Sequence, residues 1–316
     1  MDILIVGSGA IGIAIGASLA SRGMNVTFYA RENTAKAIED GGVKRTGIFG
    51  EIDIPGDRVG VVRQLSELAA DSVDVCLVCA KTLANDEISV KLNENRKILR
   101  QNGVIALLQN GWGNDQAYLR FFDRTQLFHA RVITGFTREK PNVSRVTVHT
   151  APILFGSLYG CDPEPLLPVA EAINDAGIES ALTDKLSEAL WAKMLYNTTL
   201  NPLGAVLNVP YGRLAESAHT KNLMNRLIDE TFLVMNAYGY RTFWNTPDEY
   251  KEVFYAKLVP DTKEHRSSTL QDLEKKQHTE IETLNGCIVR LAEEKGIAVP
   301  THRCIVEMIR AIEDWF

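Results

Sequence analysis

Hydrophobic residues in the first third of the chain come in short, nearly continuous runs, each followed by glycine or polar residues. Ile3–Val6, Val73–Cys79 and Val104–Leu108 are runs of this kind, and they are typical of parallel strands that are buried on both faces. A helix is predicted at Ala10–Ser21 and a further strand at Asn25–Ala30. This alternation predicts an α/β fold whose N-terminal part is a Rossmann-type doubly wound sheet.

The pattern changes near the middle of the chain. Two stretches without helices between them, Arg145–His149 and Ile153–Phe155, predict a strand meander that closes the first domain. A helix is predicted at Pro163–Ala176 and a short strand at Ile178–Leu182, so the domain is expected to end near Thr183.

From residue 184 onward the apolar positions recur with the period of an α-helix. The main predicted helices are Leu186–Leu207, Ala218–Tyr238, Pro247–Leu258 and Thr279–Glu294. The sequence therefore predicts a nucleotide-binding Rossmann domain at residues 1–183 and an all-α domain at residues 184–316.

Composition narrows the classes of partner. Hydrophobic residues make up 45% and charged residues 23% of the 316 residues, as in globular proteins. The net charge of −6 argues against nucleic acid as the main partner, and no apolar run approaches the roughly 18 residues of a membrane span. The first predicted strand directly follows the initial Met, so no signal peptide is expected.

The cysteines and histidines predict neither a redox centre nor a metal site. Cys76 and Cys79 form a C-x-x-C pattern, but they lie inside a predicted buried strand and are interpreted as core residues. The alternative is a redox or metal pair. The six histidines show no ligand spacing, and a reducing cytoplasm is the expected compartment.

A glycine pattern follows the first predicted strand. Gly7, Gly9 and Gly12 have G-x-G-x-x-G spacing, in which the glycines allow a tight turn, close approach of a pyrophosphate and close packing of the helix on the strand. The helix that follows would direct its N-terminal amides at the phosphate. The predicted cofactor contacts are Gly7, Ser8, Gly9, Ala10, Ile11 and Gly12. A glycine-rich turn without a nucleotide is the alternative.

The residue after the second predicted strand indicates which nicotinamide cofactor binds. NAD sites usually have a carboxylate there, whereas this chain has Arg31, followed by Glu32. An arginine can form a charged fork on a 2′-phosphate, so the sequence predicts NADP(H), with Lys36 in reach to assist. The alternative is that Arg31 is an ordinary surface residue paired with Glu32.

Two polar residues follow other predicted strands. Lys81 comes after the strand Val73–Cys79, and Asn110 lies in the glycine-rich loop after Val104–Leu108. Ligands of open parallel sheets bind beyond such carboxyl ends, so both residues are candidates for contact with cofactor or substrate. A solvent-facing lysine and a turn asparagine are the alternatives.

Three polar residues line one face of the first C-terminal helix. Lys193, Asn197 and Asn201 are spaced four apart among apolar neighbours, and buried polar residues are costly unless they have polar partners. They are candidates for contact with a polar ligand. Alternatively, Pro202 bends the helix and the asparagines bind the carbonyl groups that it frees.

A second polar group lies further along the chain. On one unbroken helix Ser268 and Glu280 would be about 18 Å apart, so a break between them is expected. Thr279–Glu282 fits a capping box, with Thr279 as N-cap of a new helix and Glu280 in its first turn. The alternatives are that Glu280 is an ordinary first-turn carboxylate without a role in a site and that Ser268 caps a helix.

At these residues the sequence resembles the ketopantoate reductase (2-dehydropantoate 2-reductase) family. The resemblance spans the chain from the glycine pattern to residues 296–300. Its most specific parts are Trp191–Lys193, Asn197, Asn201–Leu203, Leu270–Asp272, His278–Ile281 and Asn285–Gly286.

The resemblance implies a role for each residue that matches the family pattern. Lys193 matches the general acid, which protonates the carbonyl oxygen while NADPH delivers hydride, and Glu280 matches the glutamate that helps to position the substrate. Lys81 matches a lysine near the nicotinamide, and Arg31 matches the 2′-phosphate ligand. The matching substrate contacts are Asn110, Asn197, Asn201 and Ser268.

The implied function is NADPH-dependent reduction of ketopantoate to (R)-pantoate, a step towards coenzyme A. Two departures from the family pattern leave the 2-keto acid open: Trp112 replaces a smaller aliphatic residue, and the loop 135–143 lacks a glycine before Val143. The alternatives are another branched or hydroxylated 2-keto acid and a non-catalytic NADPH-binding regulator, although a regulator would need neither Lys193 nor Glu280. The oligomeric state stays open, with a homodimer as one hypothesis.

Overall fold

The computed structural model describes all residues, Met1–Phe316, and they form two compact units. The first unit comprises residues 1–109 and 114–186, and the second comprises residues 110–113 and 187–316. The short segment Asn110–Gly113 thus belongs to the second unit by its contacts, although residues of the first unit precede and follow it in the sequence.

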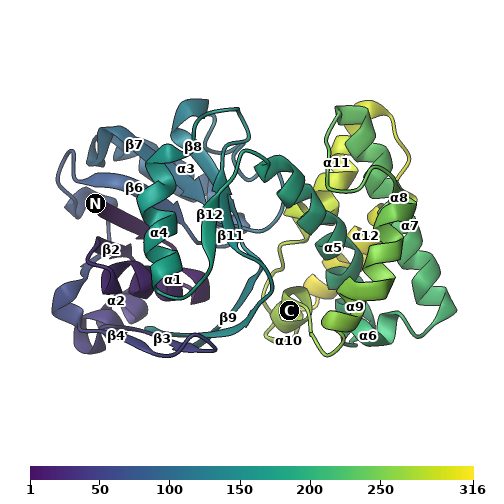
Figure 1. Cartoon of the computed structure of the whole chain (residues 1–316), viewed down its shortest axis with the longest axis horizontal. Helices are drawn as coiled ribbons and strands as arrows, with labels where there is room; N and C mark the ends of the chain where they lie inside the picture. Colours follow the sequence, from purple (N-terminus) through teal and green to yellow (C-terminus); the bar gives the residue numbers. More distant parts are fainter. The chain divides into compact units, whose positions relative to one another are not determined.

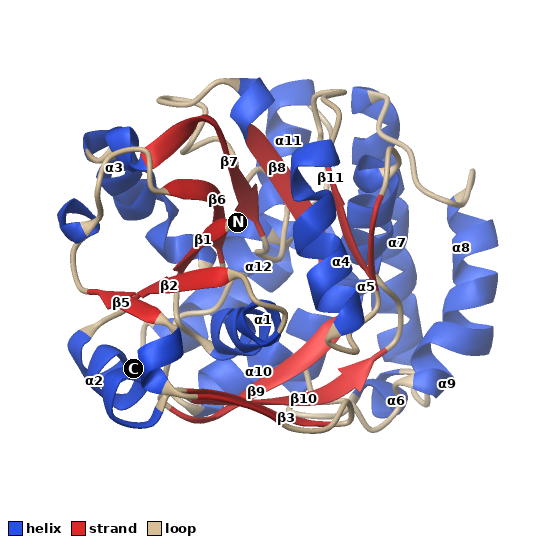
Figure 2. Ribbon diagram, turned by 60° about the vertical axis from the view of Figure 1, so that its left-hand side comes forward, coloured by secondary structure: helices blue, strands red, loops and turns tan.

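The first unit is built on an eight-stranded sheet (Figure 2) with the order β12-β11-β8-β7-β6-β1-β2-β5. The strands are β1 Asp2–Val6, β2 Asn25–Tyr29, β5 Gly60–Val62, β6 Val73–Val78, β7 Leu99–Leu107, β8 Leu127–Arg131, β11 Ile153–Gly156 and β12 Ser180–Leu182. From β5 to β8 all neighbours are parallel, in the order of a Rossmann sheet, which reverses between β1 and β6. The predicted Rossmann-type fold is confirmed.

A smaller four-stranded sheet has the order β4-β3-β10-β9. Its strands are β3 Val43–Gly47, β4 Ile52–Ile54, β9 Thr134–Lys140 and β10 Val143–His149. The predicted meander is wrong in this respect, because β10 pairs with β3 and β9 while β11 joins the main sheet. β3 escaped prediction because its sequence is polar, although its Arg45 is buried and donates to Ser18 Oγ at 2.9 Å.

Helix α1 (Ala10–Ser21) lies between the two sheets (Figure 2). Because it is covered on several sides, the residues Gly12–Leu19 are all buried. The other helices of this unit are α2 Glu32–Gly41, α3 Asn85–Glu94 and α4 Leu167–Asp175. Two apolar cores lie on the two faces of the main sheet. Cys76 lies fully buried in one of them, and both Cys76 and Cys79 are free thiols, as their interpretation as core residues requires.

The second unit is helical, as predicted. Its helices are α5 Leu186–Leu207, α6 Tyr211–Leu214, α7 Ala218–Tyr238, α8 Pro247–Val253, α9 Val259–Asp261, α10 Ser268–Glu274, α11 Asn285–Lys295 and α12 Pro300–Glu313. A single π-helical stretch, Phe254–Leu258, continues α8. Helices α7, α11 and α12 pack side by side (Figure 1). No helix of the chain is both long enough and apolar enough to span a membrane.

Candidate functional site

The glycine turn after β1 is held together by backbone atoms. Gly7 has φ +101°, and a Cβ there would lie 2.3 Å from the backbone nitrogen of Ala80. A Cβ on Gly12 would lie 2.2 Å from the carbonyl oxygen of Gly7. Since both distances are far below van der Waals contact, only glycine fits either position.

The start of α1 is open to a ligand. A Cβ on Gly9 would meet no atom within 4 Å, so no other protein group covers the backbone at this point. No side chain caps the helix and no acidic residue lies in its first turn. Backbone amides and a helix dipole in this arrangement form an anion site. Ser8 Oγ donates to the carbonyl oxygen of Tyr29 at 3.1 Å and ties the turn to the end of β2. The residues from Gly7 to Gly12 therefore fit the phosphates of a dinucleotide.

Arg31, two residues after β2, is exposed, and its side chain makes no hydrogen bond or ion pair within the chain. Glu32 does not pair with it. Instead, Arg63 Nε donates to Glu32 Oε2 at 2.6 Å, so the alternative in which Arg31 pairs with Glu32 is wrong. Lys36 is also exposed, one turn into α2. The guanidinium of Arg31 is thus available to an anion.

The ends of β6 and β7 are tied together by Gln109. Its Nε2 donates to the carbonyl oxygen of Ala80 at 2.8 Å and to Oδ1 of Asn85 at 2.6 Å. Lys81 is exposed directly after this junction. Gln109 also fixes the point at which the chain enters the Asn110 loop.

In the second unit Asn110 joins Lys193 to Glu280. Lys193 Nζ donates to Asn110 Oδ1 at 2.5 Å, and Asn110 Nδ2 donates to Glu280 Oε2 at 3.3 Å. All three side chains are half-buried. The structure therefore brings together three predicted residues from distant segments, with the ammonium of Lys193 fixed by a neutral amide oxygen. A charged donor held in this way can both orient and protonate a developing oxyanion.

The Asn110 loop is anchored by backbone and aromatic contacts. Gly111 has φ +95°, and the Trp112 N–H donates to the carbonyl oxygen of Thr283 at 3.0 Å. The Trp112 ring packs against Trp191 and Tyr240, with centroid distances of 4.9 and 5.0 Å. Trp112, one of the two departures from the family pattern, therefore anchors the loop within an aromatic cluster.

The three polar residues of α5 differ in their surroundings. Asn201 is buried, and its Oδ1 accepts a hydrogen bond from the Tyr211 hydroxyl at 2.5 Å. Burial raises the pKa of Tyr211 well above its ordinary value, so this hydroxyl stays a donor. Asn197 is half-buried and its side chain makes no hydrogen bond within the chain. Of the two asparagines, Asn197 has its amide available to a ligand.

Pro202 lies inside α5 and cannot donate to the carbonyl of Thr198 four residues earlier. Asn285 takes over this role, because its Nδ2 donates to the Thr198 oxygen at 2.9 Å. The alternative in which Asn197 or Asn201 binds the freed carbonyl is therefore wrong. Asn285 Nδ2 also lies 3.1 Å from His302 Nδ1.

His302 is fully buried, and burial lowers its pKa to about 4. Its Nε2 lies 3.0 Å from the carbonyl oxygen of Leu227, which only accepts. The neutral imidazole therefore carries its proton on Nε2 and accepts from Asn285 on Nδ1.

The residues around Glu280 depart from the predicted capping box. The predicted break is present, since α10 ends at Glu274, but α11 begins only at Asn285. Thr279 does not pair with Glu282. Its N–H and Oγ donate to Oε1 of Glu313, at 2.8 and 2.7 Å. Glu280 consequently lies directly before the short 3₁₀ turn Ile281–Thr283 and not in the first turn of α11.

Ser268 is the exposed first residue of α10, and its hydroxyl group makes no hydrogen bond within the chain. The cap of this helix is its neighbour Ser267, whose Oγ accepts from the Leu270 N–H at 3.0 Å. Ser267 Oγ also donates to the carbonyl oxygen of Asn201 at 2.9 Å. The alternative role of Ser268 as a cap is therefore wrong.

Both parts of the chain match models of one protein family. Residues 3–160 match the model described as ketopantoate reductase PanE/ApbA, and residues 185–313 match the model of its C-terminal part. The chain belongs to the ketopantoate reductase family. It is 37% identical over 314 residues to the 2-dehydropantoate 2-reductase of Aquifex aeolicus (strain VF5), with 99% of this chain and 97% of the relative covered. As a member of this family, the chain is an oxidoreductase.

Solved structures show the same fold. The 2-dehydropantoate 2-reductase from Geobacter metallireducens GS-15 is 26% identical, with a TM-score of 0.86 over 98% of this chain and 99% of that one. A D-mandelate dehydrogenase with NADH and anilino(oxo)acetate is 20% identical, also with a TM-score of 0.86, over 100% of this chain and 99% of that one. Ketopantoate reductases thus share their fold with an enzyme seen with NADH.

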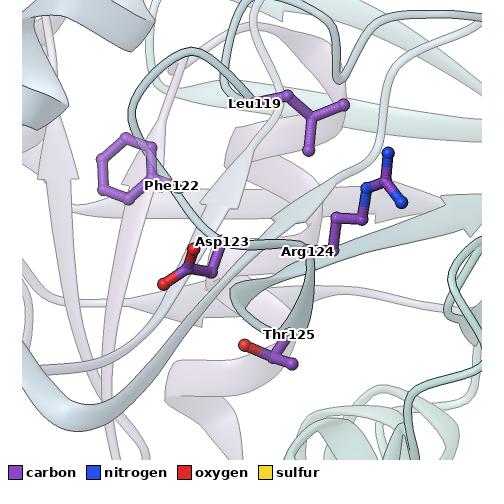
Figure 3. Close-up of a pocket in the computed structure, with 5 residues that line it drawn as sticks. All are labelled: Leu119, Phe122, Asp123, Arg124 and Thr125. Carbon is purple, nitrogen blue, oxygen red and sulfur yellow. The ribbon is translucent and has the colours of Figure 1, made fainter.

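The supporting roles of several residues around this ketopantoate reductase family site were not predicted from the sequence, although Asn285 was named as part of the resemblance. Tyr211 holds Asn201, and Ser267 caps α10. Asn285 binds a carbonyl of α5, and Glu313 holds Thr279 directly before Glu280. Only Pro202 gave a signal in the sequence, because a proline inside a helix leaves a carbonyl group that needs another donor. A surface hollow lined by Leu119, Phe122, Asp123, Arg124 and Thr125 (Figure 3) contains none of the predicted residues.

Proposed function

We propose that this protein reduces 2-dehydropantoate (ketopantoate) to (R)-pantoate with NADPH, a step in pantothenate and coenzyme A biosynthesis. The observation that carries the proposal is the chain of hydrogen bonds from Lys193 through Asn110 to Glu280. The full-length similarity to a protein named 2-dehydropantoate 2-reductase supports the substrate.

The cofactor, when bound, supplies a hydride to the keto carbon. As negative charge develops on the keto oxygen, the Lys193 ammonium stabilises it and donates a proton, so that the new O–H bond forms as an N–H bond breaks. Asn110 holds the ammonium in place. Glu280, Asn197 and Ser268 then orient the substrate, and Asn201 shapes the same helix face from its position against Tyr211.

The preference for NADPH over NADH rests on Arg31. An exposed guanidinium that makes no hydrogen bond or ion pair within the chain suits a 2′-phosphate. Lys81 is proposed to contact the nicotinamide end of the cofactor. A cytoplasmic location is part of the proposal, because five cysteines without a disulfide are typical of a reducing compartment. A homodimer stays a hypothesis.

The test is the loss of reduced-cofactor absorbance with purified protein and ketopantoate, run in parallel with NADPH and NADH. Fast oxidation of NADPH and slow oxidation of NADH would support the reaction, the substrate and the cofactor together. Turnover of a different branched or hydroxylated 2-keto acid in its place would correct the substrate alone. NADPH binding without turnover of any 2-keto acid would favour the regulator.

The cofactor assignment has its own test in Arg31→Ala. We expect NADPH to bind about tenfold more weakly, because a charge-assisted fork is lost, and NADH to bind almost unchanged. Equal losses for both cofactors would remove Arg31 from recognition of the phosphate.

A further inference from the structure

Two carboxylates on α2 follow the arginine that is proposed to bind the 2′-phosphate. Glu32 directly follows Arg31 and begins α2, and Glu39 lies about two turns further along the same helix. Both carboxylates are exposed, at 72% and 44% of their side-chain surface. A carboxylate repels a phosphate, and one near the end of β2 is the usual partner of the ribose 2′-hydroxyl of NAD(H). Without a counter-charge, Glu32 would therefore work against NADP(H).

Arg63 supplies that counter-charge to both carboxylates. Its Nε and Nη2 donate to Glu32 at 2.6 and 3.1 Å, and its Nη1 and Nη2 donate to Glu39 at 2.7 and 2.9 Å. These bonds lower the pKa of both carboxyl groups, so both are charged and held. All three guanidinium nitrogens are occupied by carboxylate oxygens.

The main chain fixes Arg63 beside the end of β2. Strands β2 and β5 are parallel, with Tyr29 opposite Val62, and Figure 2 shows them as neighbours at the edge of the sheet. The N–H of Ala30 donates to the carbonyl oxygen of Val62 at 3.0 Å. The N–H of Arg63 donates to Oε1 of Glu67 at 3.0 Å, so the residue that carries the fork is itself anchored.

We propose that Arg63 is a specificity residue for the cofactor and that it acts through Glu32. It draws both carboxylates into one fork and leaves Arg31 as the charge available to the 2′-phosphate. The formal charges of the cluster cancel, because Arg31, Lys36 and Arg63 stand against Glu32, Glu39 and Glu67, whereas loss of Arg63 leaves one net negative charge. This inference rests on the proposed use of NADPH.

The first experiment compares Arg63→Ala with Arg100→Ala in the full-length protein. Arg100 is a matched control, because it also forks two carboxylates, Asp2 and Asp74, at 2.7 and 2.6 Å. Those carboxylates lie at the amino ends of β1 and β6, away from the glycine turn. Dissociation constants for NADPH and NADH would be measured by fluorescence titration.

We expect Arg63→Ala to weaken NADPH binding about tenfold, because one uncompensated charge then faces the phosphate. NADH binding should be unchanged or tighter, since the released Glu32 can accept a hydrogen bond from the ribose. Arg100→Ala should leave both constants within about twofold of the wild type. Unchanged NADPH binding in Arg63→Ala, or an equal loss in Arg100→Ala, would overturn the inference.

The second experiment separates action through Glu32 from direct contact with the phosphate. The variant Arg63→Ala with Glu32→Gln has a neutral cluster again, so NADPH binding should return to within about threefold of the wild type. If the double variant binds NADPH as weakly as Arg63→Ala, Arg63 touches the phosphate itself and the inference is wrong.

Arg31→Ala distinguishes failure of this inference from failure of the proposed cofactor. If Arg31→Ala abolishes a preference for NADPH that Arg63→Ala leaves intact, only the role of Arg63 fails. If the wild type binds NADH as tightly as NADPH, the cofactor assignment fails and the role of Arg63 fails with it.

Discussion

The glycine turn of the first unit is formed by backbone atoms, whereas the lysine site of the second unit is formed by side chains. At the turn the functional surface is main chain, shaped by glycines that no side chain can replace. At the lysine site it is a set of side chains from three distant segments, joined by Asn110. A backbone site is encoded locally, whereas a side-chain site depends on distant residues that hold each of its members.

The largest expected effect falls on the side-chain site, in Lys193→Ala. We expect turnover to fall by about 10²- to 10⁴-fold, because the proton donor is lost, while NADPH binding stays within about twofold. The exposed Lys257 provides the control, since Lys257→Ala removes the same group elsewhere in this unit. Steady-state kinetics and fluorescence titration measure both quantities. Full turnover in Lys193→Ala would exclude Lys193 from the mechanism.

The buried His302, which lies next to Asn285, should make the stability of the protein depend on pH. Burial lowers the pKa of His302 from 6.5 to about 4, so the unfolded chain binds more protons between these two values. The free energy of unfolding should be highest above pH 6.5. It should decrease as the pH falls towards 4, with a contribution from His302 on the order of 3 kcal/mol.

Denaturant unfolding of His302→Gln and of the wild type across this range measures that contribution. The variant should be less stable above pH 6.5 but should vary less with pH. His219→Gln, at an exposed position on α7, is the control. Identical slopes for His302→Gln and the wild type would show that His302 does not stay neutral in the fold.

The hydrogen bond from Asn285 to the Thr198 carbonyl can be tested by giving residue 202 a backbone N–H again. Asn285→Ala should cost about 2 kcal/mol, because it leaves the buried Thr198 carbonyl and His302 Nδ1 without their donor. In a Pro202→Ala background residue 202 has an N–H again, so Asn285→Ala should cost about 1 kcal/mol less. Urea unfolding of the four proteins in this cycle gives the coupling. Additive losses would mean that Asn285 does not compensate for the proline.

The smallest expected effect concerns the backbone site. Gly9→Ala adds a Cβ that meets no protein atom within 4 Å, so the midpoint of thermal unfolding should hardly change. NADPH should nevertheless bind about tenfold more weakly, because the methyl group occupies the approach of the pyrophosphate. Gly12→Ala, whose Cβ would lie 2.2 Å from Gly7 O, should lower both stability and binding. Unaltered binding in Gly9→Ala would place the phosphates elsewhere.

Sequence patterns predicted the parts of the molecule that are local. The helices α5 and α7 and the glycine turn follow from periodicity and spacing alone, because each is encoded within about twenty residues. Strand β3 was missed because its burial depends on pairing with β10, which is a hundred residues away in the sequence. No local pattern contains such a pairing.

The site residues divide in the same way. Lys193 was found because it lies on an apolar helix and matches a family motif. The capping box at Thr279 was wrong because Glu313, from the C-terminal helix, competes for the same donors. Asn285 appeared only as part of a motif, since the carbonyl that it binds belongs to another helix. Ser268 was preferred over Ser267 by resemblance, and only the structure shows the neighbour's role as a cap.

The placement of residues 110–113 has a consequence for protein engineering. These residues belong to the second unit, yet they are encoded well before the rest of it. A chimera of two relatives joined near residue 184 would take its Asn110 loop from one parent and the residues that anchor it from the other. Such hybrids should recover activity only when residues 110–113 come from the same parent as the helical unit, so the natural module for recombination is discontinuous in the gene.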